Sequence, residues 1–245
     1  MSTWKQASAF VVGRSHIKEE LPCQDRTVCS EVEGIFMIAL ADGAGSAKKS
    51  DVGAEAALQT LTAYIGEHYD ELIAKDPVEI SGELLKVVLT RLTELAEEQE
   101  QSLGEFSSTL LFAAVKDEIY LAGHLGDGLI AVEKEEGLGT LSYPENGEYA
   151  NSTYFTTSKD AASHLRIYKG ELDEIQAFFL MSDGTTETMH RKQDDTLAPA
   201  LKVISGWFDE HPVETLTDAL HKNLENVIRQ RTMDDCSMAI MKRMK

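Results

Sequence analysis

The stretch IALADGAGSAKKSDVGAEAA, residues 38–57, changes character where its apolar run meets Asp42. The run before Asp42 is typical of a buried strand, and the small residues after position 50 are typical of a helix. A glycine directly after an aspartate frees the backbone to turn sharply and lets its carbonyl oxygen approach a metal closely. The stretch therefore predicts a strand and a helix joined by a tight turn, with a carboxylate at the end of the strand.

Acids follow or precede apolar runs at three further places. An Asp-Gly pair ends an apolar run at Asp127 and at Asp183, and Asp234 and Asp235 directly precede the last apolar run. A single Asp-Gly pair is more often a simple turn than a site. Several together indicate a site, because strand ends can direct short side chains at one point, where clustered carboxylates repel unless a cation neutralises them. Oxygen ligands without histidine or cysteine partners favour Mg²⁺ or Mn²⁺ over zinc.

The composition predicts a single acidic domain that spans residues 1–245. Hydrophobic residues make up 42% of the chain, and 42 acidic against 23 basic residues give a net charge of −19. This charge disfavours binding to nucleic acid or to anionic lipid. The three cysteines lack paired CxxC spacing, which argues against a disulfide framework and a structural zinc site. With no export leader or membrane-span pattern, we expect a monomeric protein of the cytoplasm.

The apolar periodicity predicts separate groups of strands and helices. Strands are expected at 7–13, 34–43, 107–116, 118–128, 129–134, 175–184 and 236–242, and helices at 51–73, at 83–101 and in two segments between 196 and 231. Turn residues at 117–118 and 127–128 predict that the three strands between 107 and 134 form an antiparallel meander. Without regular strand–helix alternation, an α+β layered fold is favoured over a doubly wound parallel sheet.

Seven segments, in this order, resemble the type 2C metal-dependent serine/threonine protein phosphatases (the PPM family), in particular the bacterial branch. They are PCQDR at 22–26, ADGAGS at 41–46, FSSTLLFAAV at 106–115, GHLGDG at 123–128, PENGEYANSTYFTT at 144–157, LMSDGTTE at 180–187 and MDDCSMAIM at 233–241. The resemblance implies a four-layer α-β-β-α sandwich, in which two antiparallel sheets are flanked by helix pairs.

The resemblance also implies roles for individual residues. Asp42 would bridge two Mn²⁺ or Mg²⁺ ions, the carbonyl of Gly43 would ligate one ion, and Asp183 and Asp234 would complete the shell of the other. Asp25 would hold water that is coordinated to the ions. These four aspartates form the expected catalytic set.

A third, weaker ion and a reaction class follow from the same resemblance. Asp127, together with Asp183, resembles the pair that binds the further ion in bacterial members. Because a phosphate monoester is anionic, attack by hydroxide needs charge compensation, which two divalent ions provide. The resemblance therefore implies direct hydrolysis of phosphoserine or phosphothreonine by a metal-bridging hydroxide, without a covalent enzyme intermediate.

Several positions depart from the family pattern. The arginine that grips substrate phosphate has no clean counterpart, and Arg14 or His16, at an altered spacing, could take that role. Ala44 stands where many eukaryotic members have a histidine proposed to protonate the leaving oxygen, so the acid for that step is unidentified. Asp235 stands where asparagine is common, and Gln24 replaces a frequent glutamate.

A polar segment around residues 143–172 matches the family's flap beside the active site. A long loop in a compact domain is often functional, so we expect this segment to shape substrate choice. The expected partners are a phosphorylated protein and a cognate serine/threonine kinase.

Two other functions stay open at this point. One is a pseudophosphatase that binds phosphoproteins without cleaving them, although the retained acids argue against it. The other is a two-metal hydrolase of small phosphoesters. A nuclease is disfavoured by the negative charge.

Overall fold

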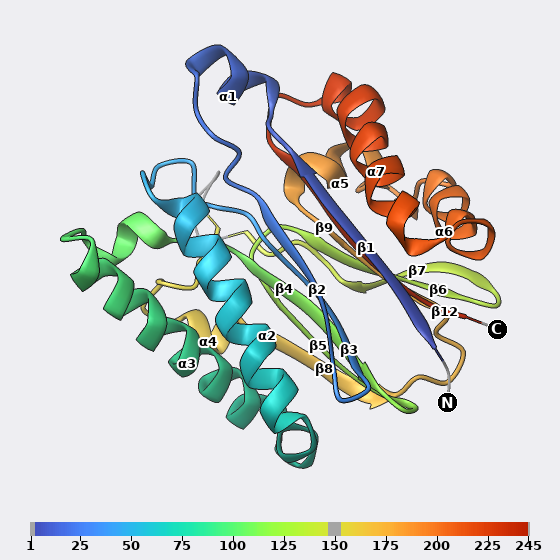
Figure 1. Ribbon diagram of the computed structural model, residues 1–245, viewed down its shortest axis with the longest axis horizontal. Helices are drawn as coiled ribbons and strands as arrows, with labels where there is room; N and C mark the ends of the chain where they lie inside the picture. The colour runs from blue at the N-terminus through green and yellow to red at the C-terminus, as the bar shows by residue number, and fades with distance from the viewer. Residues whose placement is uncertain (1–2, 147–152, 245) are drawn as a thin grey trace.

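The computed structural model describes residues 3–146 and 153–244 and contains two five-stranded antiparallel sheets packed face to face (Figure 1). The first sheet has the order β2-β3-β4-β5-β8. Its strands are β2 (Arg26–Val32), β3 (Ile35–Ala41), β4 (Leu110–Lys116), β5 (Ile119–Leu125) and β8 (Arg166–Glu171). The second sheet has the order β1-β12-β9-β6-β7. Its strands are β1 (Trp4–Val11), β6 (Leu129–Lys134), β7 (Gly137–Ser142), β9 (Ala177–Met181) and β12 (Cys236–Arg243).

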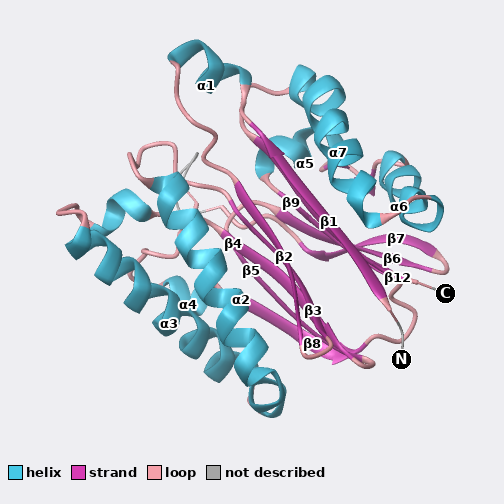
Figure 2. Ribbon diagram, in the orientation of Figure 1, coloured by secondary structure: helices cyan, strands magenta, loops and turns pink. Residues whose placement is uncertain are grey.

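Helices cover the outer face of each sheet (Figure 2). The first sheet is covered by α2 (Ser50–Ala74), α3 (Pro77–Glu98) and the short α4 (Ala161–His164), and the second by α6 (Ala200–Glu210) and α7 (Val213–Asn223). Asp76 caps α3 by accepting hydrogen bonds from the backbone N–H groups of Val78 and Glu79, both at 2.9 Å, which fixes where that helix begins.

Short elements join these layers. They are α1 (Arg14–Glu19), α5 (Asp183–Met189), the 3₁₀ turns Leu103–Phe106 and Arg229–Arg231, the π-helical turn Leu224–Ile228, and a small hairpin of β10 (His190–Arg191) and β11 (Thr196–Leu197). In the described part of the chain, no helix combines the length and the apolar character needed to span a bilayer.

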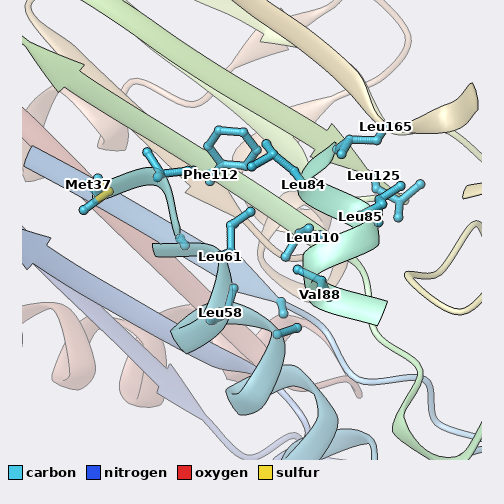
Figure 3. Close-up of a cluster of buried hydrophobic side chains, with 14 of the residues drawn as sticks. Met37, Leu58, Leu61, Leu84, Leu85, Val88, Leu110, Phe112, Leu125 and Leu165 are labelled. Carbon is cyan, nitrogen blue, oxygen red and sulfur yellow. The ribbon is translucent and has the colours of Figure 1, made fainter. Parts of the chain in front are cut away.

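Strand β3 shows why the inner strands read as continuous apolar runs. Its alternate residues Met37 and Ala39 pack toward α2 and α3, whereas Ile38 and Leu40 pack into the layer between the two sheets. Figure 3 shows Met37 and Phe112 beside leucines of α2 and α3. Because both faces of the strand are buried, a polar residue is tolerated only at its ends. Asp42 directly follows the strand, so it is the first position there at which a carboxylate can reach solvent.

The expected α+β sandwich is confirmed, but the expected meander is wrong in its last step. Strands β4 and β5 do form a tight hairpin, with Lys116 paired to Ile119. Strand β6 instead joins the other sheet, where it pairs with β7 and β9. The turn at Asp127–Gly128 therefore carries the chain from one sheet to the other. Strands β2, β7 and β8 and helices α1 and α5 were not expected, because their residues are polar or their segments short.

Candidate active site

Strand ends that carry acids meet at one end of the sandwich. The pairing of β1 with β12 sets Trp4 opposite Arg243. The first and last described residues therefore lie at the opposite end of the sandwich from these acids (Figure 1). A cavity of about 470 Å³ opens where the acids meet. Its wall includes five aspartates from four separate segments: Asp42, Asp127, Asp183, Asp234 and Asp235. The fold thus brings together acids that the sequence places almost two hundred residues apart.

The turn after β3 is fixed from both sides. The backbone N–H of Asp42 donates to the Thr109 hydroxyl at 2.9 Å, and the backbone N–H of Thr109 donates to the carbonyl of Asp42 at 2.8 Å. A side chain at Gly43 would place its Cβ 2.8 Å from the Ser50 side chain and 2.9 Å from the Gln24 carbonyl. Glycine is therefore required here, since the backbone runs too close to its neighbours for any Cβ.

Asp25 is a completely buried carboxylate without a well-formed hydrogen bond. It is 0% exposed, and neither of its oxygens meets the geometry of a hydrogen bond among the described residues, although the side chains of Ser237 and Ser182 lie close enough to lower its pKa. Burial, and next the charge of Asp235, raise the pKa of Asp25 well above its usual range. An unpaired buried carboxylate is costly, and a nearby cation with its bound water would remove that cost.

The other acids of the cavity also hold protons more tightly than usual. Burial is the first cause of the raised pKa of Asp42, and the charges of Asp25 and Asp183 come next. Burial, followed by the charge of Asp234, raises the pKa of Asp183 to about 6. Burial also raises the pKa values of Asp127 and Asp234. The cavity therefore concentrates negative charge that a cation would relieve.

The donor set suits a hard divalent cation. Among the described residues, no three carboxylate, imidazole or thiolate groups lie close enough together to hold an ion by themselves. Mg²⁺ commonly keeps several waters and takes only one or two carboxylates, so such pre-assembly is not needed. Carboxylates and the carbonyl of Gly43, with the buried oxygens of Asp25 nearby, fit Mg²⁺ or Mn²⁺ better than a thiolate-seeking metal.

Asp235 plays a different part from the neighbouring Asp234. It is only 3% exposed, and its Oδ1 accepts from the backbone N–H of Gly13 at 2.5 Å and faces Nδ1 of His16 at 3.0 Å. Its Oδ2 accepts from the backbone N–H of Gln24 at 2.6 Å. The sequence shows Asp235 only as a departure from the common asparagine, and it does not predict this clamp. The two adjacent acids were the available signal, because both line the cavity whereas the expected set of metal ligands includes only Asp234.

A family model matches most of the chain. The model described as "Protein phosphatase 2C" matches residues 12–225. The chain belongs to the protein phosphatase 2C family. A relative, "Serine/threonine-protein phosphatase 3" of Escherichia coli (strain K12), is 28% identical over 254 residues, which cover 97% of this chain and 98% of that protein.

Solved structures with the protein phosphatase 2C fold resemble the chain over nearly its whole length. A bacterial serine phosphatase superposes with a TM-score of 0.69 at 14% identity, covering 99% of this chain and 98% of that one. The serine/threonine phosphatase Stp1 from Staphylococcus aureus gives 0.67 at 14% identity, covering 99% and 96%. At these identities the likeness establishes the shared fold.

The two candidate phosphate-binding residues of this phosphatase 2C domain differ in placement. His16 lines the acidic cavity. Arg14 is not among the cavity-lining residues that the structure describes, and its Nε donates to the carbonyl of Thr232 at 2.7 Å. The geometry therefore favours His16 over Arg14 as the group that meets a ligand.

Part of the flap-like segment 143–172 lies directly beside the cavity. Thr153 and Phe155 line it, and the backbone N–H of Thr156 donates to the carbonyl of Ser108 at 2.8 Å. The base of the segment is tied down by Glu145, whose carboxylate contacts His164 at 2.9 Å. The expected flap also includes residues 147–152, which lie outside the described residues.

Proposed function

We propose that residues 1–245 form a single metal-dependent protein serine/threonine phosphatase domain. The observation that carries this proposal is the convergence of Asp42, Asp127, Asp183 and Asp234 on one cavity, with the completely buried Asp25 behind it. Family membership and the name of the Escherichia coli relative support the same activity.

The cavity residues divide into groups with distinct tasks. Asp42, the carbonyl of Gly43, Asp183 and Asp234 would hold two Mn²⁺ or Mg²⁺ ions, and Asp127 with Asp183 a third. When bound, such ions neutralise phosphoryl charge and supply an ionised water at neutral pH, so that phosphate can leave by direct hydrolysis. Asp25 would orient water on the inner side of the cavity.

The remaining wall of the cavity would receive the substrate. His16, or Arg14 after release from the Thr232 carbonyl, would contact the phosphate. Thr153 and Phe155 would contact the polypeptide that carries the phosphorylated residue, because they are the residues of the flap-like segment that line the cavity. The substrate would be a phosphorylated protein. The phosphatase would act as a monomer in the cytoplasm, where a cognate serine/threonine kinase would be the opposing enzyme.

The test compares three substrates in the presence of Mn²⁺. A phosphothreonine peptide, a nucleotide and para-nitrophenyl phosphate are each incubated with wild-type protein, with Asp42→Asn and with the matched surface variant Asp218→Asn. The proposal predicts that wild-type protein and Asp218→Asn release phosphate from the peptide, that a chelator stops this release, and that Asp42→Asn releases none. Peptide binding without release would indicate a pseudophosphatase, and preference for the nucleotide or the aryl phosphate would indicate a small-phosphoester hydrolase.

A further inference from the structure

The acidic cavity contains a histidine held by an aspartate. Nδ1 of His16 lies 3.0 Å from Oδ1 of Asp235, and His16 is the one imidazole that lines the cavity in the described part of the chain. The ring is 13% exposed and Asp235 3%. The pair therefore lies in the wall, where one edge of the ring faces the protein and little of it faces bulk water.

Asp235 is itself fixed, so it can hold the ring in one orientation. Two backbone N–H groups, from Gly13 and Gln24, bind its two oxygens at 2.5 and 2.6 Å. An aspartate anchored in this way fixes the tautomer and orientation of an imidazole that donates to it from Nδ1. Nε2 of His16 makes no hydrogen bond within the described residues, and this atom is not fully buried. It is therefore available to a ligand in the cavity.

The proposed reaction needs a group of this kind. A seryl or threonyl oxygen leaves as a poor alkoxide unless a proton reaches it as the bond to phosphorus breaks, and such proton transfer contributes typically about 10²–10⁴-fold to a rate. The position that carries a histidine in many eukaryotic relatives is Ala44 here, which has no proton to donate. The cavity acids Asp42 and Asp183 are expected to face cations, which leaves them unsuited to protonating the leaving oxygen.

We propose that His16, oriented by Asp235, donates the proton to the leaving seryl or threonyl oxygen. In this step water supplies the new oxygen on phosphorus and releases its surplus proton to solvent, the phosphorus–oxygen bond to the side chain breaks, and its electron pair stays on the leaving oxygen. That oxygen takes the proton from Nε2, and His16 regains a proton from solvent. Asp235 is a positioning residue that balances the charge of the doubly protonated ring. The inference rests on the proposed phosphatase function.

The experiment compares two leaving groups within each protein preparation. His16→Asn keeps an amide N–H that can reach Asp235 but cannot donate a proton to an alkoxide, and His16→Gln is a second variant. His221→Gln, on the exposed side of α7, is the matched control. Initial rates are measured with a phosphothreonine peptide and with para-nitrophenyl phosphate, whose nitrophenolate leaves without needing a proton. Because both rates come from one preparation, their ratio does not depend on the fraction of folded protein.

The role of His16 predicts a selective loss. The kcat for the peptide falls about 10²–10⁴-fold in both His16 variants, whereas the rate with the aryl phosphate falls less than roughly tenfold. Asp235→Asn shows the same selectivity with a smaller loss. Equal losses on both substrates, or no loss, overturn the role of His16 while leaving the phosphatase function in place. Wild-type protein that releases phosphate from neither substrate contradicts the phosphatase function and the role of His16 together.

Discussion

The carboxylate of Asp235 accepts a hydrogen bond at 2.6 Å from the backbone N–H of Gln24, 211 positions earlier in the chain. Asp25 follows Gln24, and Asp234 precedes Asp235, so this one contact ties two proposed functional acids from opposite ends of the chain to the same cavity edge. The same side chain binds the backbone N–H of Gly13. A buried carboxylate that accepts two backbone N–H groups thus holds the cavity edge together.

The first prediction concerns the clamp formed by Asp235. In Asp235→Asn the amide NH₂ must face one of the N–H donors of Gly13, Gln24 or His16, because a single oxygen cannot replace both carboxylate oxygens. A buried donor left without an acceptor costs about 1–3 kcal/mol. Urea denaturation of the metal-free protein measures this loss in the free energy of unfolding. The exposed Asp218→Asn is the control, and a variant at position 235 as stable as that control would contradict the clamp.

The second prediction uses two glycines that both lie in helices. A Cβ at Gly184, in α5, would lie 2.1 Å from the carbonyl oxygen of Asp235, whereas a Cβ at Gly206, in α6, meets no atom within 4 Å. Gly184→Ala should therefore lower the free energy of unfolding by about 1–3 kcal/mol through overpacking. Gly206→Ala should raise it by about 0.5–1 kcal/mol through helix propensity. Thermal unfolding compares the pair, and equal midpoints would mean that α5 does not pack against the Asp235 backbone as described.

The third prediction is a pH dependence in metal-free protein. The pKa of Asp183 is raised from 3.8 to about 6 in the folded state, so the folded protein binds this proton more tightly than the unfolded chain. Its stabilising contribution, up to about 3 kcal/mol, is complete below the unfolded pKa and is lost as the pH rises through the folded pKa. In Asp183→Asn the free energy of unfolding should lack this part of its decline with rising pH. Chelator-treated samples in urea, measured from acidic to neutral pH, give the two stability curves, and parallel curves would refute the shift.

The fourth prediction concerns Phe155 on the flap side of the cavity. Phe155→Ala removes a ring from the cavity wall, so the KM for a phosphothreonine peptide should rise roughly tenfold, equivalent to about 1.4 kcal/mol of lost contact. The KM for para-nitrophenyl phosphate should change little, since that substrate carries no polypeptide. Val203→Ala, exposed on α6, serves as the control. A parallel rise in both KM values would show that Phe155 acts on the phosphate rather than on the peptide.

The long elements of the fold could be predicted from the sequence because their burial is periodic. The apolar spacing over residues 51–73 predicts α2, and the strand expected over residues 34–43 corresponds to β3. The polar strands β2 and β8 were missed because they lie at the edges of their sheet, where few side chains are buried. The turn at Asp127–Gly128 was misread because a turn signal records a local change of direction, not the sheet that the next strand joins.

The cavity acids could be predicted because each follows or precedes an apolar run. The place of Asp25 beside the proposed ions was implied only by the family resemblance. The clamp of Asp235 could not be predicted, because it depends on contacts between segments about two hundred residues apart. The preference for His16 over Arg14 also required the structure, since the spacing alone left both residues open.

The central claim is that the acids of this cavity bind divalent cations, and calorimetric titration with Mn²⁺ tests it most directly. Wild-type protein and Asp218→Asn should bind more than one ion per chain near neutral pH and release protons as they do so, because the raised pKa values leave the carboxylates partly protonated. Asp42→Asn should show little of the heat that wild-type protein gives on binding Mn²⁺. No uptake by wild-type protein, or the same uptake by Asp42→Asn, would contradict the account.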